Sequence, residues 1–183
     1  PRFVVALASA AVGQSVMSFL MVSTPLAMIG CGHAFTDATF VIQWHVIAMF
    51  APSFVTGQLI QRFGVERIIV TGAALNLACV AVNVSGLDVA HFWLGLVLLG
   101  VGWNFMFVGG TTLLTRAYAP EERAKVEGVN EVCMFGTVVF ASGGSGAMLE
   151  ILGWTAMNLV VIVPIVAVTI ALVSLQRAEA KAA

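Results

Sequence analysis

Hydrophobic positions gather into six long runs along the chain, and polar or charged positions separate the runs from one another. A helix that crosses a membrane needs about 20 mostly apolar residues, because the hydrocarbon core of a bilayer is about 30 Å thick. The runs therefore predict six transmembrane helices, whereas the strands of a membrane barrel would appear as alternating segments of about ten residues. The predicted spans cover residues 3–29, 40–60, 68–86, 92–115, 126–149 and 154–175.

The composition supports an integral membrane protein with an all-α fold. Of the 183 residues, 60% are hydrophobic and 9% are charged, and the mean hydropathy is +1.03. Soluble domains carry about 25% charged residues, so this composition excludes an ordinary soluble fold. The net charge of −1 provides no basic field for nucleic acid. Cys31, Cys79 and Cys133 lie far apart, with no histidine at ligand spacing, and we expect neither a metal site nor a disulfide.

The basic residues all fall on one side of the predicted topology. They are Arg2, Arg62, Arg67, Arg116, Arg123, Lys125, Arg177 and Lys181. The connections on the other side contain acidic residues and histidines but neither lysine nor arginine. Because basic loops remain in the cytoplasm, we expect both ends of the chain and its two charged connections to be cytoplasmic. An odd number of spans would break this segregation, so the charges independently support six.

The connection between the second and third spans carries the strongest motif. It reads Gly57-Gln-Leu-Ile-Gln61-Arg62-Phe-Gly64-Val-Glu-Arg67. It resembles the signature loop of the major facilitator superfamily, in which glycines, an acidic-basic pair and further basic residues link two helices of a six-helix half. We expect Gly57 to allow close helix approach and Gly64 a tight turn. Arg62 and Arg67 are suited to meet helix C-termini or acidic groups during a conformational change.

This loop departs from the family pattern at three positions. Gln61 stands where the family usually has Asp, and Val65 and Glu66 stand where it has basic residues. Such a degenerate loop is similar to that of the C-terminal half of these transporters. A plain cytoplasmic turn with topology-setting arginines is the alternative, and it explains the arginines alone.

The resemblance implies a single membrane domain over residues 1–183, built as two inverted three-helix repeats with a cytoplasmic tail at 176–183. It implies a secondary carrier in a bacterial inner (plasma) membrane, without a cofactor, that moves a small solute by alternating access. The substrate site of such a carrier lies between two halves. The chain starts at Pro1 without a methionine, so we expect a cut within a longer chain and a missing N-terminal six-helix half as partner. A homodimer of half-transporters is the alternative.

In a half of this family the first and fourth spans should line the central cavity, with the second and fifth beside it. The candidates for substrate contact are Gln14, Met17, Ser18, Met21, Trp103, Asn104 and Phe107. Together they predict an amide-bearing, aromatic and methionine-lined wall that suits an organic solute of modest size. Plain helix packing through interhelical amides uses the same residue types and stays an alternative.

Two ionisable residues within the spans are candidates for proton coupling. Glu131 lies one to two turns from the cytoplasmic end of the fifth span, and His45 lies in the outer third of the second. Ionisable groups inside a membrane frequently carry protons in transport cycles. The alternatives are an interfacial salt-bridge network around Glu127 and Glu131 and a packing role for His45.

The fifth span contains Gly136 and the sequence Gly143-Gly-Ser145-Gly146. Small residues at this spacing predict close approach of helix backbones. The same stretch matches the nucleophile motif of intramembrane serine proteases. A serine nucleophile needs a base, yet all three histidines lie upstream and two lie in outer loops, so we expect no enzyme. A channel is the third alternative, although no loop resembles a selectivity filter.

Overall fold

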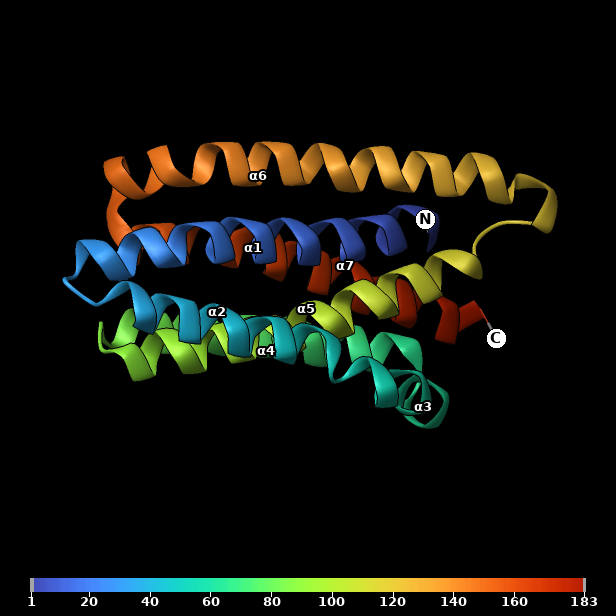
Figure 1. The fold of residues 1–183 in the computed structure, drawn as a ribbon. Helices are drawn as coiled ribbons and strands as arrows, with labels where there is room; N and C mark the ends of the chain where they lie inside the picture. Colours follow the sequence, from blue (N-terminus) through green and yellow to red (C-terminus); the bar gives the residue numbers. More distant parts are fainter. Residues whose placement is uncertain (1, 183) are drawn as a thin grey trace.

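The computed structural model describes residues 2–182, and all of its regular structure within this range is helical. The long helices run side by side as an elongated bundle (Figure 1). They are α1 (Arg2–Gly30), α2 (Phe35–Phe50), α3 (Ser53–Phe63), α4 (Val65–Ser85), α5 (Val89–Thr115), the short 3-10 helix η1 (Pro120–Glu122), α6 (Arg123–Val160) and α7 (Ile162–Ala182). The predicted all-α membrane bundle is confirmed.

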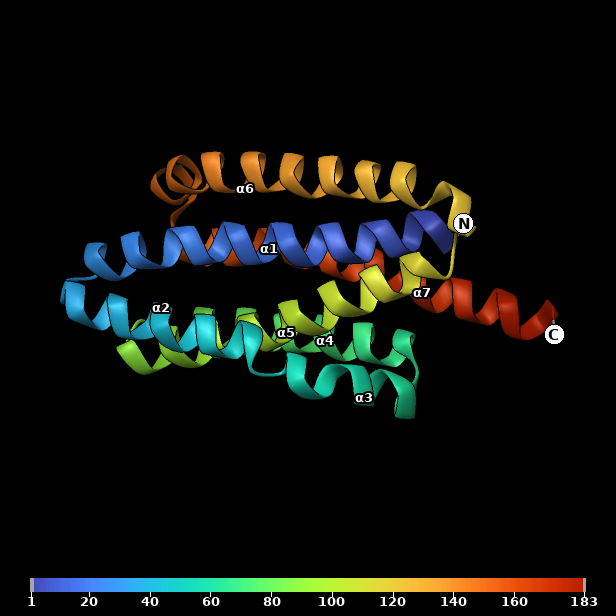
Figure 2. The same cartoon turned by 45° about the vertical axis from the view of Figure 1, so that its right-hand side comes forward.

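The bundle is built from apolar helical stretches of membrane-spanning length. Helices α1, α4 and α5 are each long and apolar enough to cross a membrane. Helices α2 and α3 are so only together, as one span bent by 42°. The last stretch, Pro120–Lys181, has 62 residues. As one straight helix it would extend about 90 Å, three times the hydrocarbon thickness. It instead turns back at Gly153, whose backbone angles are φ 75° and ψ 167°, so that α7 runs antiparallel to the long part of α6 (Figure 2). By length and composition the described residues hold four membrane-spanning stretches, or five when the bent pair of α2 and α3 counts as one span, and the six spans expected from the sequence stay a prediction.

The second predicted span, 40–60, is not one continuous helix. The chain breaks at Ala51 and Pro52 between α2 and α3. Proline lacks the amide hydrogen that would continue the ladder of α2. Its carbonyl instead accepts a hydrogen bond from the Thr56 amide at 2.9 Å, which opens α3. The sequence identifies Pro52 as a kink but does not predict two separate helices. Helix α2 begins before residue 40, and α3 ends after residue 60.

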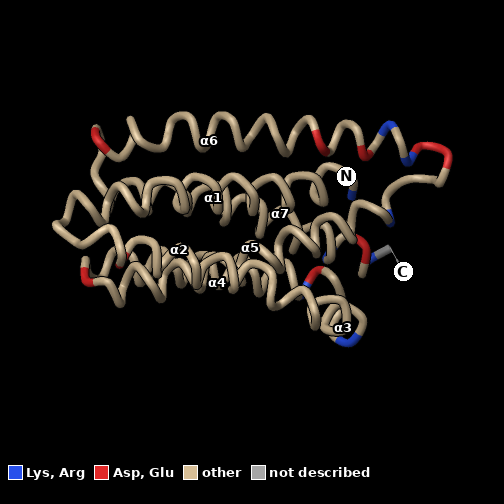
Figure 3. The backbone as a smooth tube through the Cα atoms, in the orientation of Figure 1, with Lys and Arg blue, Asp and Glu red and all other residues tan. Residues whose placement is uncertain are grey.

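Basic residues lie at one end of the bundle, which we call the basic end (Figure 3). The first and last helices meet there, because Arg2 of α1 forms a 2.8 Å ion pair with Glu179 of α7. The opposite end consists of the connections 31–34 and 86–88 and the turn at Gly153, and it carries no lysine or arginine. The charge segregation expected from the sequence is therefore present in the fold.

Helices α4 and α5 form the most extensive pair, and glycines bring them together. A Cβ atom added to Gly102 would lie 2.9 Å from the Gly72 carbonyl oxygen, and one added to Gly72 would lie 2.7 Å from the Gly102 carbonyl oxygen. Gly110 of α5 approaches Ala10 of α1 in the same manner. Such contacts leave no room for a side chain, so these glycines determine how closely the backbones approach.

The glycines singled out in the sequence do not have this role. A Cβ atom added to Gly57, Gly136, Gly143 or Gly144 would meet nothing within 4 Å in the described part of the chain. The expectation that the fifth span and Gly57 mediate close backbone approach is therefore wrong within residues 2–182. Sequence spacing cannot tell which face of a helix turns toward a neighbour, and Gly57 and Gly143 are exposed while Gly136 and Gly144 are half-buried.

Candidate functional site

A cavity of about 250 Å³ lies where α1, α5 and α6 meet, and we call it the aromatic cavity. Its walls are Gln14 of α1, Trp103 and Phe107 of α5, and Glu131, Met134, Phe135 and Val138 of α6. Three of the seven substrate-contact candidates thus come together there. Glu131, a candidate for proton coupling, joins them.

Two aromatic rings that stack on one another form part of the wall of the aromatic cavity. Trp103 and Phe107 lie four residues apart on α5, so their side chains share one face of the helix. Their ring centroids are 5.0 Å apart with an interplanar angle of 16°. Phe50 of α2 meets Trp103 edge-on at 6.1 Å. Trp103 is 8% exposed and Phe107 is half-buried, so a flat aromatic solute can stack on an outer face of this pair.

A side-chain amide fixes the indole within this wall. The Trp103 Nε1 donates a hydrogen bond of 2.7 Å to Gln14 Oε1. The amide nitrogen of Gln14 makes no hydrogen bond to another described residue, so it is free to donate to a solute. Gln14 therefore both orients the indole and offers a polar group at the edge of the cavity.

Methionines surround the aromatic pair. Met17 and Met49 pack with Trp103 in a buried cluster, and Met21 and Phe107 pack against it. Flexible thioether side chains adapt to aromatic partners of different shape. Met17 and Met21 were expected near the site, whereas Met49 of the second span was not. Ser18 is buried and does not line the aromatic cavity.

Asn104 faces away from the aromatic cavity although it follows Trp103 in the sequence. Its Nδ2 donates to the Met49 carbonyl oxygen at 2.8 Å and to the Ser53 hydroxyl at 2.7 Å. Its Oδ1 lies 2.7 Å from the Thr56 hydroxyl. The side chain is 1% exposed. Asn104 thus connects α5 to both sides of the α2–α3 break, which is the interhelical role that the sequence left open.

The second candidate for proton coupling lies apart from the aromatic cavity. The His45 ring is fully buried between α2 and α5, with Nδ1 2.7 Å from the Leu96 carbonyl oxygen. Its Nε2 has no hydrogen-bond partner among residues 2–182. The structure therefore associates Glu131, and not His45, with the predicted cavity residues.

The salt-bridge network expected around Glu127 and Glu131 includes only the first of the two. Arg123 Nε donates to Glu127 at 2.9 Å, and the Tyr118 hydroxyl donates to the same carboxylate at 3.3 Å. Desolvation, followed by the charge of Glu127, raises the pKa of the Tyr118 phenol. Glu131 forms no ion pair with another described residue. Its carboxylate is exposed at the edge of the cavity.

The signature-like loop forms the turn between α3 and α4. Gly64 has a φ of 91°, which favours glycine, and it ends one helix and precedes the next. Gln61, Arg62 and Arg67 are exposed at the basic end, and the Arg62 guanidinium lies 5.3 Å from the centre of the Phe63 ring. Neither arginine forms an ion pair within residues 2–182.

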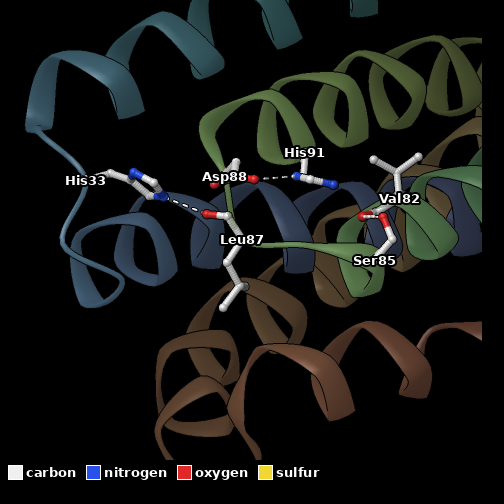
Figure 4. A network of polar contacts seen from close by, with 6 residues as sticks. All are labelled: His33, Val82, Ser85, Leu87, Asp88 and His91. Atoms are coloured by element: carbon white, nitrogen blue, oxygen red, sulfur yellow. Dashed lines mark hydrogen bonds and ion pairs between the residues drawn. The ribbon is translucent and has the colours of Figure 1, made fainter.

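Ser145 has no catalytic partner within the described residues. Its buried hydroxyl donates to the Ser142 carbonyl oxygen of its own helix at 2.9 Å. Figure 4 shows two of the histidines at the opposite end, where His33 lies 2.6 Å from the Leu87 carbonyl oxygen and His91 lies 3.7 Å from Asp88. The third is His45, whose contact is described above. No base adjoins the serine.

Comparisons with known proteins identify the family and relatives of the chain. The family model described as Major Facilitator Superfamily matches residues 3–183. The chain is 45% identical over 170 residues, 93% of its length, to a Brucella anthropi protein named riboflavin transporter RfnT, and covers 42% of that protein. It is 36% identical over 139 residues, 75% of its length, to the uncharacterized MFS-type transporter YddS of Bacillus subtilis, and covers 31% of it.

The chain therefore spans less than half the length of these relatives. No solved structure matches the chain significantly.

Proposed function

Because the chain belongs to the major facilitator superfamily, we propose that it forms one six-helix wall of a secondary carrier that moves a small organic solute by alternating access. The solute would bind against the aromatic cavity and between this wall and a second one. An N-terminal six-helix half supplies that second wall in this proposal, since the matched relatives are more than twice as long. A second copy of this chain is the alternative partner.

The proposed solute is a flavin of the riboflavin type. The stacked pair of Trp103 and Phe107 carries this proposal, because the flat ring system of a flavin stacks on aromatic side chains. The free amide nitrogen of Gln14 suits the carbonyl-bearing edge of such a ring. The 45% identity to a protein named as a riboflavin transporter supports the same solute.

We propose that the basic end faces the cytoplasm, by the positive-inside rule. Glu131 is the proposed proton-coupling residue, since it combines a carboxylate without an ion pair among residues 2–182 with a place in the wall of the aromatic cavity. Arg62 and Arg67 are the proposed cytoplasmic contacts that change when the two walls move. No catalytic step belongs to this function.

The test uses the complete protein purified into proteoliposomes that contain unlabelled riboflavin. Entry of labelled riboflavin by counterflow needs neither a coupling ion nor a known direction of transport. We expect saturable exchange that excess riboflavin suppresses. A Trp103→Ala variant should lose about tenfold in activity, because it removes the stacked ring. Trp44→Ala is the matched control, because Trp44 lies on α2 outside the aromatic cavity. Absence of riboflavin exchange would reject the solute, and flux that does not saturate would indicate a channel.

Coupling is tested separately with Glu131→Gln. We expect this variant to retain counterflow but to lose riboflavin movement driven by an imposed proton gradient. Counterflow and gradient-driven transport that both equal those of the unmodified protein would exclude Glu131 as the coupling group.

A further inference from the structure

A second cavity of about 240 Å³ opens between α5 and α6 beside the aromatic cavity. Glu131 lines both cavities, so they adjoin one another. Six of the seven residues that line the second cavity carry polar side chains, and we call it the polar cavity. Its polar residues are Thr111, Thr115, Tyr118, Glu127, Asn130 and Glu131.

One face of α5 lines both cavities, and its side chains are aromatic in the first and carry hydroxyl groups in the second. Trp103, Phe107, Thr111 and Thr115 follow one another at intervals of four residues, so they share a face of the helix. From Phe107 to Thr111 the helix rises about 6 Å, which a chain of a few carbon atoms can span. The groove thus passes from stacked rings to hydroxyl groups toward the basic end.

The polar cavity is rich in hydrogen-bond acceptors. The Thr111 hydroxyl donates to the Phe107 carbonyl oxygen at 2.9 Å, and the Thr115 hydroxyl donates to that of Thr112 at 2.8 Å. Both oxygen atoms therefore remain able to accept a further hydrogen bond. Glu131 adds a carboxylate without an ion pair in the described part of the chain. A ligand that complements these acceptors must provide hydrogen-bond donors.

The side-chain oxygen of Asn130 gives separate evidence for a ligand in this cavity, because it lacks a hydrogen-bond partner among residues 2–182. Its side chain lines the polar cavity and is only 6% exposed, yet its Oδ1 has no hydrogen-bond partner among residues 2–182. Buried side-chain polar atoms nearly always have a partner, and each exception calls for an explanation. A hydroxyl group that enters the cavity with the solute would satisfy this amide after a small rotation of the side chain.

We propose that the polar cavity is the subsite for the hydroxylated chain of the transported solute, whose ring occupies the aromatic cavity. This inference rests on the proposed function and adds an explanation of which flavins the carrier selects. The subsite favours a flavin that carries a polyol chain over the same ring without it. A phosphate at the end of that chain would meet the carboxylate of Glu131, which has no ion pair among residues 2–182, so the phosphorylated flavin is disfavoured.

The experiment measures counterflow of riboflavin and of lumiflavin, the ring without the polyol chain, by the complete protein. We expect Asn130→Leu and Thr111→Val each to raise the KM for riboflavin about five- to tenfold, the effect of one lost hydrogen bond. The KM for lumiflavin should stay within about twofold on the same grounds. Thr112→Val is the matched control, because Thr112 is a neighbouring hydroxyl on α5 outside the polar cavity.

The outcomes separate the subsite from the function on which it rests. If the unmodified protein exchanges no flavin, the proposed function fails and the subsite with it. If it exchanges riboflavin but both variants affect the two flavins equally, or neither flavin at all, the function stands and the subsite is wrong. Should Asn130→Leu not reach the membrane, Thr111→Val decides the question. Flavin mononucleotide that competes as well as riboflavin would overturn the role of the Glu131 carboxylate.

Discussion

The indole nitrogen of Trp103 donates a 2.7 Å hydrogen bond to the side-chain oxygen of Gln14, joining α5 to α1 across 89 positions of sequence. This bond holds the indole in the plane in which it stacks on Phe107. A ring held in place before the solute arrives loses less conformational entropy when the solute binds. The pair therefore connects the packing of the bundle to the affinity of the proposed site.

Replacing Trp103 with phenylalanine keeps a stacking ring and removes the donor. We expect the KM for riboflavin counterflow to rise about fivefold with little change in kcat, because a typical hydrogen bond contributes about 1 kcal/mol. Trp44→Phe, outside the aromatic cavity, should leave both constants unchanged. An unaltered KM in Trp103→Phe would show that the bond to Gln14 does not orient the ring.

Asn104 is expected to control stability rather than solute affinity. Asn104→Leu removes the buried hydrogen bonds to the Met49 carbonyl group and from the Thr56 hydroxyl at the α2–α3 break. A buried polar group left unpaired costs about 1–3 kcal/mol. Thermal unfolding in detergent should occur at a lower temperature, while the KM of the protein that remains folded is unchanged. A raised KM with unaltered unfolding would instead return Asn104 to the solute cavity.

The α4–α5 contact makes a second stability prediction. Gly102→Ala introduces a Cβ atom 2.9 Å from the Gly72 carbonyl oxygen, which forces the helices apart. Overpacking of this kind costs about 1–3 kcal/mol. Gly128→Ala is the control, because a Cβ atom there meets nothing within 4 Å. We expect only Gly102→Ala to lower the unfolding temperature, and equal effects would mean that this close approach is unimportant.

The orientation can be tested with a cysteine that the chain already contains. Cys31 is exposed at the opposite end of the bundle, whereas Glu121 is exposed at the basic end. A membrane-impermeant maleimide should label Cys31 in intact cells, and Cys31→Ser should abolish that signal. In the Cys31→Ser background, Glu121→Cys should react only after the cells are permeabilised. The reverse pattern would overturn the proposed cytoplasmic position of the basic end.

The sequence alone determined the membrane class, the all-α fold and the separation of charges. These properties follow from the composition of contiguous segments, because a run of about 20 apolar residues suits a bilayer regardless of its neighbours. The resemblance to the family, which implies that the first and fourth spans line the cavity, and the position of Gln14, Trp103 and Phe107 near the middle of those spans made them candidates for one cavity. The positive φ at Gly64 was likewise predictable from a glycine in a short turn.

Only the tertiary structure decided which face of each helix meets which neighbour. Adjacent residues on a helix point about 100° apart, so Trp103 reaches the aromatic cavity while Asn104 connects to the α2–α3 break. For the same reason, the sequence predicted close packing at Gly136 and at Gly143-Gly-Ser145-Gly146 of the fifth span, whereas Gly72 and Gly102 provide it in the structure. Contacts between distant segments depend on how the helices rotate and pack together, and spacing within a single span does not contain that information.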